Sequence, residues 1–109
     1  MAKYLCLGKY SAQGAAGARK DGYATREQEG SKAFESVGAK IESWMWLDWT
    51  EWDFAFIADV PLPETLVRIT SLTAATGTFT RAYISQILDS DAMDQGVSGI
   101  SYRPPGAQS

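Results

Sequence analysis

Apolar residues along this chain alternate with polar ones in four stretches and recur at helical spacing in two more. Alternation predicts a strand, and a period near 3.6 residues predicts an amphipathic helix. Gly38 and Gly77 follow the two helical stretches, where a glycine commonly ends a helix. Ser11–Gly22, rich in glycine and alanine, predicts a connecting loop with one helical turn. The predicted strands are Ala2–Tyr10, Ala39–Asp48, Trp52–Val60 and Thr78–Leu88, and the predicted helices are Tyr23–Val37 and Pro63–Thr76.

The predicted elements follow the order strand, helix, strand, strand, helix, strand. Right-handed crossovers then place two helices on one face of a four-stranded antiparallel sheet. The short connection Trp49–Glu51 favours an antiparallel hairpin between the two middle strands. We therefore expect an α+β fold with the ferredoxin-like βαββαβ arrangement.

Strict alternation also assigns side chains to the faces of the sheet. It places Phe79 on the same face as Arg81, and Ile41 on the same face as Met45. The helical period places Leu72 in the buried stripe of the last predicted helix.

The central hairpin, Lys40–Val60, contains all four tryptophans of the chain. Large apolar residues occupy both faces of the predicted strands, whereas the helices cover only one face. An exposed aromatic face is an association surface, because burying apolar area stabilises by about 25 cal/mol per Å². We therefore expect a homodimer whose sheets pack face to face or close into a shared barrel. Assembly of such dimers into a higher oligomer is also compatible with the sequence.

Length and charge narrow the function classes. The chain has 109 residues, which is the length of one domain. We expect residues 1–88 to form that domain and residues 89–109 to form an acidic and then glycine- and proline-rich tail. The net charge of −3 argues against a nucleic-acid partner, because such a surface needs cations to displace counterions.

Cysteine and histidine usage excludes several chemistries. Cys6 is the only cysteine, so no disulfide can form within the chain, which favours a reducing compartment. Its apolar neighbours predict a buried structural thiol. With no apolar run long enough for a signal peptide or a membrane span, we expect a cytoplasmic protein without a membrane partner. The chain has no histidine, the commonest general base and zinc ligand, so we expect neither a metal nor a cofactor.

Several segments of the sequence resemble the GYD-domain family. The resemblance lies in Lys3–Gly14, in Arg26, in Gly38 with Lys40, in Glu51-Trp52-Asp53 with the apolar strand after it, and in Gly77. It covers about Met1 to Leu88. The resemblance implies a dimeric α+β barrel, in which ferredoxin-like subunits pair through their sheets, and it carries over no activity. Thr50 and Trp52 stand where the family motif has glycine and tyrosine.

Polar and aromatic residues gather at or near the predicted strand ends. An aspartate among aromatics can act as acid or base when burial raises its pKa, and Asp53 is the candidate base. We favour the simpler reading that Asp53 pairs with an arginine such as Arg81 or Arg26 and holds the hairpin. The expected ligand-binding residues are Tyr10, Arg26, Trp46, Asp48, Trp52, Asp53 and Arg81.

Three functions fit these observations. The first is a homodimeric binding or assembly module that holds a small apolar or aromatic ligand in an aromatic-lined cleft. The second is a cofactor-independent oxygenase or isomerase, with Asp53 as base, Tyr10 as hydrogen-bond donor and Arg81 as anion stabiliser. The third is RNA binding through the open sheet, which the acidic composition disfavours.

Overall fold

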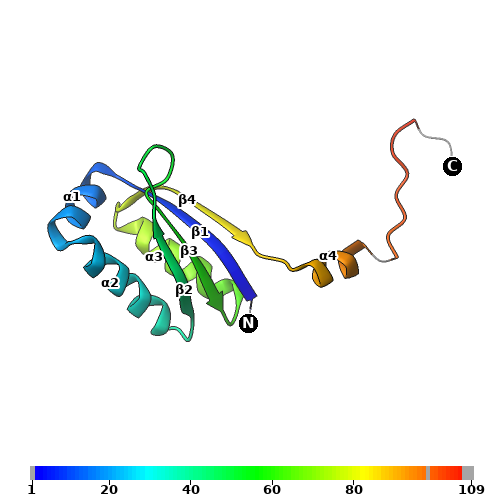
Figure 1. Ribbon diagram of the computed structural model, residues 1–109, viewed down its shortest axis with the longest axis horizontal. Helices are drawn as coiled ribbons and strands as arrows, with labels where there is room; N and C mark the ends of the chain where they lie inside the picture. Colours follow the sequence, from blue (N-terminus) through cyan, green and yellow to red (C-terminus); the bar gives the residue numbers. More distant parts are fainter. Residues whose placement is uncertain (1, 98, 107–109) are drawn as a thin grey trace.

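The computed structural model describes residues 2–97 and 99–106 and contains one antiparallel sheet in the order β2-β3-β1-β4 (Figure 1). This is the sheet order of the ferredoxin-like fold, so the predicted α+β class is confirmed. The elements are β1 (Ala2–Tyr10), α1 (Ala12–Asp21), α2 (Tyr23–Glu35), β2 (Lys40–Trp46), β3 (Phe54–Val60), α3 (Pro63–Ala75), β4 (Phe79–Gln86) and α4 (Ser90–Val97).

The segment after β1 is a helix, α1, and the prediction of a loop with one helical turn was wrong. Ser11 caps α1, since its side chain accepts a hydrogen bond from the Gly14 amide at 3.0 Å. The Ser11 amide also donates to the Thr78 carbonyl at 2.8 Å, which fixes α1 against the start of β4. A side chain at Gly14 would overlap that carbonyl, so the glycine is needed for close approach. Gly22, at φ 95°, then separates α1 from α2.

One face of the sheet lies under the helices, and its core centres on β1 and β3. Cys6 stands opposite Phe56, and Gly8 stands opposite Phe54. The covered face and the helices contribute the buried apolar residues Cys6, Tyr10, Ala18, Phe34, Ala39, Phe54, Phe56, Ala58, Val60 and Leu66.

Two bulges change the faces that strict alternation assigned. The register of β1 and β4 shifts at Lys9/Tyr10, which sets Phe79 opposite Tyr10 on the covered face while Arg81 stays on the open face. A second shift, between Ile41 and Ser43, brings Ile41 to the covered face. Both predictions of shared faces were therefore wrong, because each bulge inserts one residue that alternation does not count.

Helix α3 packs with Leu66 buried, whereas Leu72 is 72% exposed. The prediction that Leu72 belongs to the buried stripe was therefore wrong. The side of α3 toward the sheet carries Ile69, Thr70 and Thr73 instead.

The hairpin between β2 and β3 has a longer connection than the predicted Trp49–Glu51. It spans residues 47–53, and its ends are joined by the Leu47 amide donating to the Asp53 carbonyl at 2.9 Å. Within it Trp49 adopts φ 69°, and the Asp48 carboxylate accepts from the Thr50 amide and hydroxyl.

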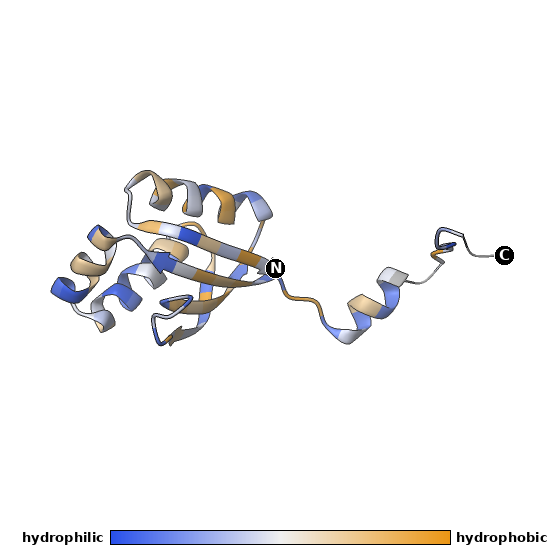
Figure 2. Cartoon of the chain, turned by 90° about the horizontal axis from the view of Figure 1, so that it is seen from above, coloured by the Kyte–Doolittle hydropathy of each residue, from blue (hydrophilic) through white to orange (hydrophobic). Residues whose placement is uncertain are grey.

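The chain beyond β4 leaves the body as an arm. Figures 1 and 2 show α4 and residues 99–106 extending away from the sheet and helices. Helix α4 spans eight residues. Residues 1, 98 and 107–109 of the predicted domain and tail lie outside the described part of the chain. Among the described helices, none has the length and apolar character that crossing a membrane requires.

Candidate functional site

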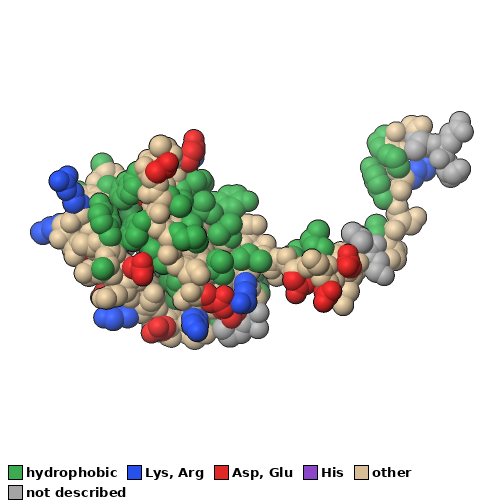
Figure 3. All heavy atoms as spheres, viewed as in Figure 1, with side chains coloured by type: hydrophobic (Ala, Val, Ile, Leu, Met, Phe, Trp, Pro, Cys, Tyr) green, Lys and Arg blue, Asp and Glu red, His purple; other side chains and the backbone are tan. Residues whose placement is uncertain are grey.

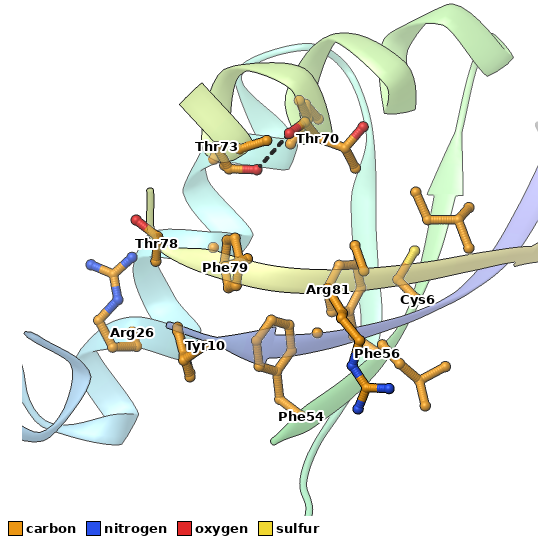
Figure 4. A pocket seen from close by; sticks show the side chains of 18 of the residues that line it. Cys6, Tyr10, Arg26, Phe54, Phe56, Thr70, Thr73, Thr78, Phe79 and Arg81 are labelled. Carbon is orange, nitrogen blue, oxygen red and sulfur yellow. Dashed lines mark hydrogen bonds between the residues drawn. The ribbon is translucent and has the colours of Figure 1, made fainter. Parts of the chain in front are cut away.

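A cleft separates helices α2 and α3 from the covered face of the sheet (Figure 4). Its volume is about 420 Å³, which is within the range of small-ligand pockets. On edge strand β4, Ile84 lies on the covered face and still is 39% exposed. The cleft therefore opens to solvent along β4, where α3 does not cover the strand.

Three parallel, stacked aromatic rings form one wall of the cleft. The Trp44 ring is parallel to Phe54 and Phe56, with centroid distances of 4.9 and 5.2 Å and interplanar angles of 11° and 9°. A side chain at Gly8 would overlap the Phe54 ring, and one at Gly30 would crowd Trp44 at 3.2 Å. The two glycines therefore allow Phe54 to lie close to β1 and Trp44 to lie close to α2.

One end of the cleft is closed by Tyr10 and Phe79, whose rings stack at 5.2 Å. Tyr10 is only 7% exposed, and its burial raises the pKa of the phenol, while the nearby Arg26 acts to lower it. The Arg26 guanidinium lies beside Tyr10 and Thr78 in Figure 4. Its Nη1 is 3.4 Å from Asp21 Oδ2, and both side chains are partly exposed.

Asp53 is fully buried, but it does not line the cleft. Its Oδ1 lies 2.9 Å from Lys9 Nζ, and its Oδ2 accepts a hydrogen bond from the Tyr10 amide at 2.8 Å. Lys9 Nζ also donates to the Trp49 carbonyl at 3.0 Å. The carboxylate therefore holds the hairpin connection to the end of β1, and its charged partner is Lys9 in place of the arginine expected from sequence.

Trp52 and Arg81 lie on the open face. The Arg81 guanidinium carbon is 4.6 Å from the centroid of the Trp52 ring, and Nη2 donates to the Glu51 carbonyl at 2.6 Å. Figure 4 shows the Arg81 side chain pointing away from the helices, so its guanidinium lies on the other side of the sheet although the residue borders the cleft.

Trp46 and Asp48 belong to the hairpin. Trp46 packs edge-on against Tyr23 at 5.1 Å and does not line the cleft. Hydrogen bonds from Thr50 lower the pKa of the exposed Asp48 carboxyl. Of the seven expected residues, only Tyr10 and Arg26 bring their side chains to the cleft. The other five lie in the hairpin or on the open face.

The enzyme hypothesis requires a base, a donor and an anion stabiliser at one place. Asp53 contacts the main chain of Tyr10, but its carboxylate is enclosed and the Arg81 guanidinium faces the other side of the sheet, so the three functional groups do not meet in the cleft. In the described part of the chain, no three acidic, cysteine or histidine residues are grouped so that they could hold a metal ion.

The sequence pattern missed several lining residues of the cleft. Thr70 and Thr73 form the α3 side, and each hydroxyl donates to a carbonyl one turn earlier in the helix. Gly30, in the middle of α2, lowers the helix propensity of that segment, and such a glycine is the signal in the sequence for a close approach between the helix and the sheet. Cys6 also lines the cleft, and burial raises the pKa of its thiol to about 12.

Comparison with protein families matches residues 4–97 of the chain to the model described as the GYD domain. The match begins within β1, includes the other three strands and reaches the end of α4. No curated protein matches the chain.

Proposed function

The chain belongs to the GYD domain family, and we propose that it is a small-molecule-binding module that acts as a homodimer, with its ligand in the cleft between helices and sheet. The observation that carries the proposal is the cleft of about 420 Å³, with its wall of parallel aromatic rings. Apolar clefts with a few polar groups are the usual form of small-ligand sites. The cleft lies inside the region that the family match covers.

The open face of the sheet supports pairing of two copies. Its central residues Leu5, Leu7 and Ile57 are apolar and incompletely buried, and Tyr83 beside them is 50% exposed. A charged pair, Lys3 Nζ to Glu42 Oε1 at 2.8 Å, lies toward one end of this face. Figure 3 shows hydrophobic side chains gathered over the middle of the body and charged ones at its edges. An apolar centre with a charged rim is the anatomy of a subunit interface.

The oligomer is tested by native mass spectrometry and light scattering of the full chain at micromolar concentration. We expect a dimer, and we expect Tyr83→Asp to give a monomer because it introduces a charge beside the apolar centre of the open face. Val67→Asp is the matched control, since Val67 is 64% exposed on α3 and away from that face. A wild-type monomer at this concentration would refute the pairing.

The cleft is tested by narrowing it. Ala33 lines the cleft on α2, so Ala33→Trp should fill it, whereas Ala24→Trp places the same bulk on an exposed position of α2 outside it. We expect small aromatic compounds to bind the wild type and the Ala24 variant and to lose at least about tenfold in affinity for the Ala33 variant. Equal affinity for both variants would place binding elsewhere.

The alternative function is a cofactor-independent oxygenase or isomerase acting on a small aromatic or apolar substrate. It would use the same cleft, with the Tyr10 hydroxyl as donor. It ranks second, because Asp53, the candidate base, already has one carboxylate oxygen paired with Lys9 and the other hydrogen-bonded to the Tyr10 amide.

A further inference from the structure

We infer that the ligand of the cleft is a flat apolar molecule with a carboxylate or similar anionic group, and that Arg26 binds that group. The inference rests on the proposed ligand-binding function and adds the chemical class of the ligand. It follows from the shape of the wall, from the position of the guanidinium and from the charges around the mouth.

The wall selects a flat ligand body. Phe54 and Phe56 are parallel to within 5°, and Trp44 is parallel to both and stacks against them, so the wall is a stack of parallel rings. A planar ring system that aligns with these rings gains the offset stacking that aromatic pairs prefer.

The end of the cleft provides one cationic side chain. Arg26 lines the cleft and lies beside Tyr10 and Thr78, whereas the other lining arginine, Arg81, directs its side chain to the open face. The charged side chains around Arg26 are Asp21, at 3.4 Å, and Glu29, one turn along α2. Glu29 is exposed and is paired with Lys32 at 3.5 Å.

Arg26 interacts with the Tyr10 hydroxyl and makes one contact with Asp21, and these two interactions leave other N–H groups of the guanidinium for a ligand. The Asp21 contact is a single long one between partly exposed groups, and such surface pairs contribute about 0–1 kcal/mol. A guanidinium carries five N–H donors and binds a carboxylate through two parallel hydrogen bonds. The low exposure of Tyr10 beside it strengthens a charged hydrogen bond by excluding water.

The test compares 2-naphthoate with its neutral analogue 2-naphthylmethanol at pH 7, with affinities measured by calorimetry on the full chain. We expect wild type to bind the acid about tenfold or more tightly than the alcohol, because a hydrogen bond to a charged group contributes more than a neutral one. Arg26→Gln should reduce this preference to within about threefold. Arg68→Gln is the control, since Arg68 is exposed on α3, does not line the cleft and gives the same change in net charge.

The outcomes separate the two proposals. If both compounds bind wild type equally, or if Arg26→Gln keeps the preference, the assignment of Arg26 is overturned while the cleft remains a binding site. If neither compound binds, the small-molecule function itself fails. If Arg26→Gln does not fold, Arg26→Lys keeps the charge without the planar fork, and it should lower the preference by less than tenfold but measurably.

Discussion

Asp53 joins the hairpin to the first strand through a single side chain. It is fully buried, and its two oxygens contact Lys9 and the Tyr10 amide, while its own amide donates to the Gly8 carbonyl at 2.9 Å. A buried carboxylate with both oxygens paired is a structural group, because a ligand cannot reach it without breaking those bonds. The sequence indicated the residue and its structural role but not its partner, since Lys9 and Asp53 are 44 positions apart.

The Asp53 pair predicts a loss of stability on neutralisation. Asp53→Asn removes the charge and leaves Lys9 partly buried without its partner, so the free energy of unfolding should fall by about 3 kcal/mol. Urea unfolding measures the difference. Asp94→Asn, at an exposed position of α4, should change it by less than about 0.5 kcal/mol. Equal stabilities of the two variants would contradict the structural role.

The buried Cys6 thiol should make the free energy of unfolding depend on pH in the alkaline range. Burial raises the pKa of this thiol from 9.0 to about 12, so above pH 9 the unfolded chain releases a proton that the folded chain keeps. The stabilisation is therefore complete below pH 9 and is lost as the pH rises toward 12, at about 1.4 kcal/mol per pH unit from this group. Burial raises the pKa of Tyr10 as well, which acts in the same direction.

Urea unfolding between pH 8 and about 10.5 checks this dependence. Cys6→Ala removes the titrating thiol, so its free energy of unfolding should decline less steeply than that of wild type. Parallel slopes for the two proteins would show that the thiol does not contribute.

At the scale of helices and strands, hydrophobic patterning located six elements and their order correctly. It failed at α1, because an alanine- and glycine-rich segment has little amphipathic contrast, and its position depends on Ser11 and Gly14 meeting the Thr78 carbonyl. It also failed at the bulges, because a bulge depends on the partner strand. The cleft was not predictable in detail, since the separation of α3 from β4 is set by packing between distant segments.

Replacing glycine by alanine should have opposite effects on stability at Gly8 in β1 and at Gly17 in α1. Gly8→Ala would drive a methyl group into the Phe54 ring and should cost about 1–3 kcal/mol. Gly17→Ala, at an exposed position of α1 with nothing within 4 Å of the added carbon, should stabilise by up to about 1 kcal/mol. Thermal unfolding of both variants measures the signs. A stabilised Gly8 variant would mean that the Phe54 ring moves freely in the cleft.

At the scale of the whole molecule, one face of the sheet is covered and the other is open. The covered face holds the cleft, and the open face holds Trp52, Arg81 and Tyr83. The two faces therefore divide the proposed tasks, with ligand binding on one and pairing of subunits on the other.

Pairing through the open face predicts that stability depends on protein concentration. Folding linked to dimerisation raises the midpoint of thermal unfolding as the concentration rises. We expect the wild-type midpoint to increase measurably between about 1 and 100 μM, and the Tyr83→Asp midpoint to stay constant. A constant midpoint for wild type would separate folding from association.

Cys6 also makes local motion around the cleft measurable in time. It is the only thiol of the chain and lies in the lining of the cleft, where it is 4% exposed although the cleft opens to solvent along β4. A thiol reagent reacts once per molecule and only after the sulfur has become exposed, so at saturating reagent the labelling rate equals the rate of that exposure. If that rate is insensitive to denaturant, α3 moves away locally, and if it rises steeply, the whole domain unfolds first. The same measurement with a ligand present would report how much the bound ligand slows the exposure of Cys6.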